Sequence, residues 1–272
     1  MKHLYLACIF TLISFLAFAG NDNIPIGARA AGLSNSAVTL SDVWSVHHNQ
    51  AGLGFIKTAA VGAYYESRFL VPELALSGAV AALPLKNNKG TFGLSFRNFG
   101  YSLYSESKIG LAFGRAFGEN LSIGMQLNYQ QVRIADVYGN KNVITAEIGI
   151  QYRVSNKIYL GAHIYNPNRS RLTELDQDRL PSVIRFGFRY QFSEKLFLTA
   201  ETEKDTYNPA IFRAGFEYQA GEVLFLRAGM GTNPFASSFG FGLNLKKLKI
   251  DFAGNFHRTL GFTPQTSLTY QF

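Results

Sequence analysis

The chain has 272 residues and a formal net charge of +8. Its basic residues are scattered along the sequence and form no cluster, so the charge does not indicate nucleic-acid binding. The single cysteine, Cys8, falls in a segment that the mature protein is expected to lose, which excludes disulfide bonds and thiol chemistry. Only seven residues precede Cys8, too few for the apolar segment of a lipoprotein signal.

Residues 1–19 predict a secretory signal peptide. Lys2 gives a basic start, residues 4–18 form an apolar run, and Ala17-Phe18-Ala19 match a small-x-small cleavage site. A transmembrane helix is the alternative, but the run is short and lies at the extreme N-terminus. The mature chain is therefore expected to begin at Gly20.

Residues 20–58 lack strand-like alternation and form a separate N-terminal segment. Small residues such as Ala37 allow close packing, and Ser41 and Asp42 are suited to cap a short helix before Trp44, the only tryptophan. A periplasmic tail is the alternative interpretation. Flexible tails seldom have this density of small and apolar residues, so we expect a folded plug segment.

Residues 59–272 predict about fourteen β-strands. In residues 121–130, apolar and polar side chains alternate strictly, so one strand face is apolar and the other is polar or small. Similar blocks recur to Phe272, and strands are expected at 59–66, 74–84, 91–98, 107–116, 121–132, 143–154, 158–165, 183–192, 196–203, 210–218, 223–230, 238–245, 248–256 and 267–272. The second of these shows the weakest alternation.

The connections between these strands differ in length. Those after even-numbered strands are short, as at 193–195 and 246–247, whereas those after odd-numbered strands are mostly longer, up to 166–182. Short periplasmic turns and longer external loops are typical of outer-membrane barrels. A soluble sandwich shares the alternation but has no reason to keep this parity. The sequence therefore predicts an all-β transmembrane antiparallel barrel in the outer membrane of a Gram-negative bacterium, surrounded by lipid.

Charged residues occur on the face expected to point into the lumen. Opposite charges on neighbouring strands are expected to neutralise each other there, and a role in selectivity or substrate contact is the alternative. The candidate lumen residues are Glu147, Arg185, Arg189, Glu201, Arg213, Glu217 and Arg227.

The N-terminal segment carries a motif that resembles a known family. Gly27-Ala28-Arg29-Ala30-Ala31-Gly32 is followed by Asp42 and by Asn49-Gln50-Ala51-Gly52-Leu53, ahead of a fourteen-stranded pattern. This layout resembles the FadL-type outer-membrane barrels, and within them the PorV/PorQ-like group associated with type IX protein secretion. Family members usually have Asn-Pro-Ala-Gly where this chain has Asn49-Gln50-Ala51-Gly52. The plug-motif residues are Gly27, Arg29, Ala30, Ala31, Gly32, Asp42, Asn49, Ala51 and Gly52.

The resemblance implies a non-catalytic barrel with a plugged lumen. Secretion-associated members work with protein partners of a secretion or surface-attachment complex, whereas uptake members conduct lipophilic ligands. The short chain and brief external loops favour the secretion role. A FadL-type channel for lipophilic solutes and a purely structural outer-membrane protein are the alternatives.

No motif indicates an enzyme, a cofactor or a metal site. His47 and His48 are adjacent, and an extended segment would point them to opposite sides, which is poor metal-ligand geometry. His163 is expected to be a hydrogen-bonding residue of the lumen. His257 has Ser237 and Asp205 as conceivable triad partners, but no nucleophile elbow accompanies them. We therefore expect no catalytic residues.

Overall fold

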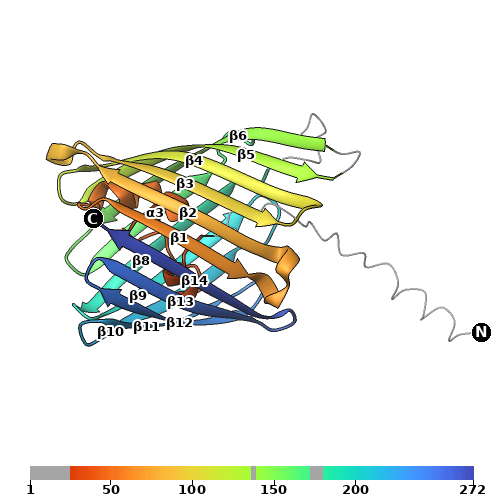
Figure 1. Ribbon diagram of the computed structural model, residues 1–272. Coiled ribbons are helices and arrows are strands. Elements are labelled where there is room, and N and C mark those ends of the chain that lie inside the picture. Colours follow the sequence, from red (N-terminus) through yellow and green to blue (C-terminus); the bar gives the residue numbers. More distant parts are fainter. Residues whose placement is uncertain (1–24, 136–138, 172–179) are drawn as a thin grey trace, which may run out of the picture.

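The computed structural model describes residues 25–135, 139–171 and 180–272. Fourteen antiparallel strands close into one barrel, in which each strand pairs with its neighbours in sequence and β14 pairs with β1 (Figure 1). The strands are β1 (Ala60–Ser67), β2 (Ala75–Pro84), β3 (Thr91–Gly100), β4 (Tyr104–Phe117), β5 (Leu121–Ile134), β6 (Gly139–Arg153), β7 (Ile158–Tyr165), β8 (Val183–Ser193), β9 (Leu196–Asp205), β10 (Ile211–Ala220), β11 (Leu224–Gly231), β12 (Ala236–Leu245), β13 (Leu248–His257) and β14 (Gly261–Gln271). The predicted all-β antiparallel barrel of about fourteen strands is confirmed. The predicted signal peptide lies outside the described residues.

The barrel wall has an apolar outer face and a polar inner face. On β5, Met125 and Leu127 are 60% and 64% exposed, whereas Gln126 and Asn128 are each 1% exposed. Closing the sheet leaves no unpaired edge, so the backbone of every strand can cross a bilayer with its hydrogen bonds made. The fold is that of an outer-membrane barrel.

Several strands extend beyond their predicted ends. β4 and β6 begin three and four residues earlier than expected, and β14 begins at Gly261 instead of at Ser267. Pro264 lies within the additional part of β14, although proline cannot donate to a sheet. It is tolerated here because pairing with β1 begins only at Gln265.

The longer strands weaken the predicted contrast in loop length. The turns at the end that carries the C-terminus are short, for example 194–195 and 246–247. At the opposite end, however, the β3–β4 and β13–β14 connections have only three residues each, and 166–182 is the one long connection. Its residues 172–179 lie outside the described part. We refer to the end with the C-terminus as the C-terminal end, which is periplasmic in barrels of this type.

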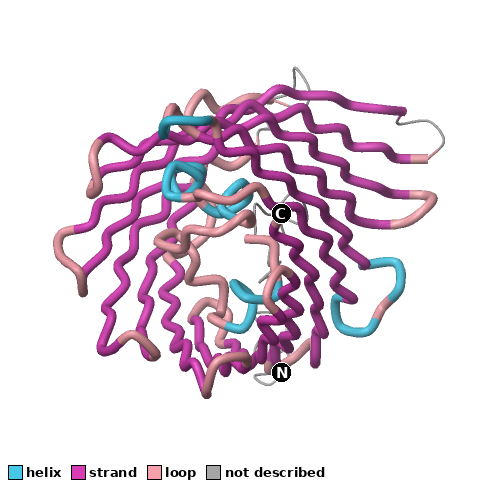
Figure 2. Tube along the Cα trace, turned by 60° about the vertical axis from the view of Figure 1, so that its left-hand side comes forward, coloured by secondary structure: helices cyan, strands magenta, loops and turns pink. Residues whose placement is uncertain are grey.

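The barrel encloses part of the N-terminal segment. Residues 25–58 lie within the ring of strands and include two short α-helices and a 3-10 helix, seen in Figure 2: α2 (Ala28–Gly32), α3 (Ser45–His48) and η1 (Gln50–Phe55). Three further 3-10 turns lie in connections between strands: η2 (Arg68–Leu70), η3 (Pro72–Leu74) and η4 (Lys86–Asn88). In the described part of the chain, no helix is long and apolar enough to cross a membrane.

Apolar side chains of the segment pack against the inner face of β1 to β4. Ile26, Trp44 and Val46 form one buried cluster with Tyr64 of β1 and Val80 of β2. Leu53 of the segment and Leu76, Ala82 and Ala112 of the wall belong to the same cluster, which we call the apolar seam. The inner face of β2 is apolar because it contacts the segment, which explains the weak alternation of that strand.

Candidate functional site

The site that the fold builds is the contact between residues 25–58 and the lumen wall. Small residues of the segment permit this contact. A Cβ on Gly32 would lie 3.2 Å from the Cβ of Arg227, and one on Gly52 would lie 2.6 Å from the carbonyl oxygen of Leu40. Gly27 has φ of 121°, which glycine adopts without strain. Of the other motif residues, Ala30 and Ala51 are fully buried and Ala31 is nearly so.

The wall approaches the segment as closely. A Cβ on Gly124 of β5 would lie 2.2 Å from the carbonyl carbon of Gln50, and one on Gly149 of β6 would lie 1.9 Å from Oδ1 of Asn49. Inward glycines therefore make the space that η1 and its preceding residue occupy.

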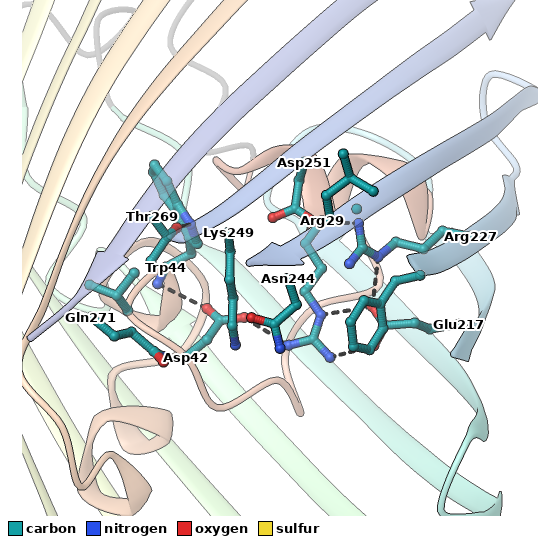
Figure 3. A pocket seen from close by; sticks show the side chains of 14 residues that line it. Arg29, Asp42, Trp44, Glu217, Arg227, Asn244, Lys249, Asp251, Thr269 and Gln271 are labelled. Carbon is teal, nitrogen blue, oxygen red and sulfur yellow. Dashed lines mark hydrogen bonds and ion pairs between the residues drawn. The ribbon is translucent and has the colours of Figure 1, made fainter. Parts of the chain in front are cut away.

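Arg29 binds the segment to β10, on the side of the barrel away from the apolar seam. Its Nε and Nη2 donate to the two carboxylate oxygens of Glu217 on β10, at 2.8 and 2.7 Å, and its Nη1 donates to Asp42 at 2.9 Å. Arg227 on β11 donates to Glu217 and to Asp251 on β13, both at 2.6 Å. Burial alone lowers the pKa of Arg29, but Glu217 and Asp42 outweigh it and raise that pKa above its ordinary value. Figure 3 shows this chain of ion pairs.

A cavity of about 110 Å³, lined by charged, polar and apolar side chains, lies beside these ion pairs (Figure 3). Lys249 and Asn244 line it, as do Thr269 and Gln271 near the C-terminus. Trp44 closes one side, with its Nε1 donating to Thr269 Oγ1 at 3.0 Å. The cavity is large enough to hold water molecules or a small polar group.

Asn49 and Gln50 bind a different part of the barrel wall, at β6 and β7. Asn49 Nδ2 lies 2.8 Å from Val38 O and also faces the carbonyl oxygens of Ile150 and Ala162, on β6 and β7. Its Oδ1 accepts the backbone N–H of Ala51 at 3.1 Å, which caps η1. Asn49 therefore holds the segment to the backbone of two wall strands.

Glu147 on β6 is the centre of a buried polar cluster. Its carboxylate accepts from Gln50 Nε2 at 2.8 Å, Lys108 Nζ at 3.1 Å and Asn128 Nδ2 at 2.9 Å. His163 Nε2 lies 3.0 Å away, as expected of a lumen hydrogen-bonding residue. A fully buried carboxylate is tolerated because it has several donors and a cation.

The remaining candidate lumen residues divide into two groups. Arg185 and Arg213 bind Glu203 at 2.6 and 3.1 Å, and Glu201 accepts the backbone N–H groups of Ala37 and Val38, each at 2.8 Å. Arg189 instead lies over the Tyr159 ring, with 3.9 Å from Cζ to the ring centroid. The network thus includes the predicted residues but uses them as structural contacts to the segment and the wall.

Some members of this interface were not predicted. Lys108 lies on the inward series of β4 with Gly110 and Ala112. The alternation of the sequence could therefore have placed Lys108 among the lumen residues. Gln50 stands where the family that the motif resembles usually has proline, and its side chain donates to Glu147, which proline could not do. Neither residue was among the predicted site residues.

The histidines differ from expectation in one respect. His47 and His48 lie in α3 and are both buried, so the geometric argument made for an extended segment does not apply to them. Burial lowers the pKa of His48 to about 4 and that of His47 well below its ordinary value. His257 Nδ1 accepts the backbone N–H groups of Thr259 and Leu260, which occupies the nitrogen that a Ser237 triad would need.

The outer wall also carries a groove. Small outward residues on β9 and β10, such as Ala200 and Ala214, form its floor, and Phe186, Phe212 and Phe235 stand around it. Its volume is about 510 Å³ and its lining is almost entirely apolar. Since it lies on the lipid-facing side, bilayer chains are its natural contents.

Comparison with solved structures identifies the architecture. The monoaromatic hydrocarbon channel CymD superposes with a TM-score of 0.74 at 12% identity, covering 93% of this chain and 99% of that one. The toluene transporter TbuX of Ralstonia pickettii gives 0.70 at 11% identity, with coverage of 92% and 98%. The chain has the fold of the FadL-type channels.

A FadL homologue of Pseudomonas aeruginosa gives the same result, with a TM-score of 0.67, 13% identity and coverage of 91% and 98%. No family model matches the sequence, and no curated protein matches it either. The FadL-type part of the predicted resemblance therefore agrees with the fold, whereas the PorV/PorQ-like subgroup stays a prediction.

Proposed function

We propose that this protein is a FadL-type channel through which lipophilic solutes cross the outer membrane. The support from comparison is the shared fold with CymD and TbuX, both named as carriers of monoaromatic compounds. This favours the channel, which was the alternative interpretation of the sequence, over a role in secretion.

The apolar seam is the observation that carries the proposal. Most of the inner wall is polar, but Tyr64, Leu76 and Val80 present apolar surface inside the barrel to Ile26 and Trp44 of the segment. A polar lumen would exclude a lipophilic solute, because the solute would have to leave an apolar phase for water. A solute that follows the seam keeps apolar contacts on the wall side.

The segment must shift for a solute to use this route. Its apolar residues occupy the seam, while Arg29, Asn49 and Gln50 hold it to the opposite walls. We therefore propose that residues 25–58 act as a plug whose displacement from the seam accompanies passage.

A partner role in type IX secretion or surface attachment is the second candidate. The observation in its favour is the extent to which buried polar contacts fix the segment, which suits a closed barrel that binds proteins at its rim. Its natural contact surface is the 166–182 connection, of which residues 172–179 lie outside the described part.

Uptake into vesicles separates the two candidates. Liposomes that contain the purified mature protein are given a monoaromatic hydrocarbon or a medium-chain fatty acid, and entry is compared with that into protein-free liposomes. The channel predicts protein-dependent, saturable uptake of at least one of the two. Equal entry with and without protein, together with co-purification of secretion components from native membranes, would favour the second candidate instead.

A further inference from the structure

Two arginines at the C-terminal end of the lumen have no carboxylate partner. Arg153 on β6 and Arg189 on β8 lie on the inward series, and the register pairs both of them with Tyr159 on β7. Within the described residues neither guanidinium forms an ion pair, and the Nε of each is buried without a hydrogen-bond partner. The three side chains therefore form one row across adjacent strands.

Aromatic rings fix both guanidinium groups. The Cζ of Arg153 lies 4.1 Å from the ring centroid of Phe55, the last residue of η1, and 5.8 Å from that of Tyr159. The Cζ of Arg189 lies 3.9 Å from the Tyr159 centroid and 5.4 Å from that of Phe197. A ring beneath a guanidinium contributes a cation–π interaction but does not neutralise its charge.

Two inward carboxylates of the lumen are already bonded to other groups. Glu217 accepts from Arg29 and Arg227, and Glu201 accepts two backbone N–H groups of the segment. Neutralisation of Arg153 or Arg189 by either of these two inward carboxylates would have to break one of these contacts. The row therefore carries two positive charges that the described protein does not neutralise locally.

We propose that Arg153 and Arg189 form a binding site for a phosphate group that reaches the barrel from its C-terminal, periplasmic end. A guanidinium stacked on a ring has its N–H donors along its edge, in the fork that phosphate oxygens accept. Since both Cζ atoms are close to the Tyr159 centroid, they lie within about 10 Å of each other, and a group with several oxygens can contact both.

The surrounding turns favour an anion as well. Lys157 lies in the β6–β7 turn and Lys195 in the β8–β9 turn, and both are exposed, with Glu194 as the acidic neighbour. Positive charge around a mouth raises the local concentration of anions. The phosphate could belong to free phosphate or to the head group of a phospholipid in the periplasmic leaflet. This inference does not rest on the channel proposal.

Binding measurements on the mature protein in nanodiscs test the site. In phosphatidylcholine nanodiscs, inorganic phosphate is titrated by calorimetry, and in a second arm nanodiscs with and without phosphatidylglycerol are compared by native mass spectrometry for retained lipid. Saturable binding in the first arm identifies free phosphate, and retained phosphatidylglycerol alone identifies a head group. Either result supports the site.

Variants show whether the two arginines are responsible. Arg153→Gln and Arg189→Gln should each weaken binding at least tenfold, whereas Arg115→Gln should leave it unchanged. Arg115 is a matched control because it also stacks on a ring, that of Phe117, at the same end but on the outer face. If a glutamine variant does not fold, Arg153→Lys and Arg189→Lys keep the charge and should weaken binding to a smaller degree. No saturable binding in either arm, or unchanged binding in the double variant, would overturn the proposal.

Discussion

Arg29 and Glu217 form a bidentate ion pair, with hydrogen bonds of 2.8 and 2.7 Å, although 188 positions separate them in the sequence. Arg29 lies in α2 inside the barrel and Glu217 lies on β10 of the wall. The pair therefore holds the N-terminal segment against the strands farthest from the apolar seam.

Replacing Arg29 with methionine should loosen the segment without opening the barrel wall. The change leaves Asp42 without its cation, while Glu217 keeps Arg227, so we expect a loss of about 3 kcal/mol in the free energy of docking. Hydrogen exchange measures this as faster exchange in residues 25–58. Arg68→Met is the control, because Arg68 pairs with Glu66 away from the segment. Unchanged exchange in the Arg29 variant would mean that the pair does not hold the segment.

Glu147 and Lys108 should show strong coupling. Glu147→Gln leaves the Lys108 ammonium, whose side chain is 3% exposed, without its carboxylate, and we expect a loss of about 3 to 5 kcal/mol in the free energy of unfolding. Adding Lys108→Met should recover part of that loss. Urea unfolding in detergent micelles measures both changes. Additive losses in the double variant would contradict the coupling.

The alternation of the sequence predicted the strands and their faces well. Residues 121–130 show the reason, because neighbouring residues of a strand always point to opposite faces, whatever the rest of the fold does. The same rule did not predict that the inward side chains are buried by contacts inside the barrel. Asn128 was expected to meet a lumen, but it is 1% exposed and bonded to Glu147, a fact that depends on strands and segment together.

The contacts of the candidate site could not be read from the sequence. Nothing local pairs Arg29 with Glu217 or Asn49 with the backbone of β6, because the closed barrel alone brings them together. The apolar seam weakened the sequence pattern of β2, because the inward residues of this strand are apolar and do not alternate with polar ones. β14 begins earlier than predicted and includes Pro264, because a proline ends a strand only where its N–H would be needed for pairing.

The segment should loosen in acid because its histidines are buried. The pKa of His48 is about 4 in the docked segment and about 6.5 in an undocked one, so between these values the undocked state binds a proton that the docked state does not. Docking should therefore weaken as the pH falls from about 6.5 to about 4 and stay constant above that range. Hydrogen exchange at pH 7.5 and 5 checks this.

A glutamine variant isolates the contribution of His48. His48→Gln keeps a donor for the carbonyl oxygen of Ile26, which His48 contacts at 2.7 Å, and should flatten part of the pH dependence. His257→Gln, at the other end of the barrel, should leave it unchanged. An unaltered profile in the His48 variant would assign the effect to other groups.

The depth of a lipid-facing residue in the membrane should determine how much its substitution by a charged residue destabilises the barrel. Leu127 lies in the middle of β5 and is 64% exposed to lipid, so Leu127→Arg should destabilise the barrel by about 2 to 4 kcal/mol. Phe117 lies at the end of β4, and Phe117→Arg should cost only about 0 to 1 kcal/mol. Unfolding in lipid vesicles provides the measurement, and the reverse order would mean that this region is not the membrane-facing midplane.

The most direct test of the proposed channel is to lock the segment in place. Ala31 of α2 and Ala253 of β13 share a buried cluster, and the only natural cysteine, Cys8, lies in the predicted signal peptide, so Ala31→Cys/Ala253→Cys introduces the two cysteines needed for one disulfide. Uptake of the transported hydrocarbon or fatty acid into liposomes is measured for the oxidised and reduced protein, with each single-cysteine variant as control. The account predicts that oxidation abolishes uptake, that reduction restores it and that the controls respond to neither treatment. Equal uptake by the locked and the reduced protein would contradict the claim that solutes pass where the segment lies.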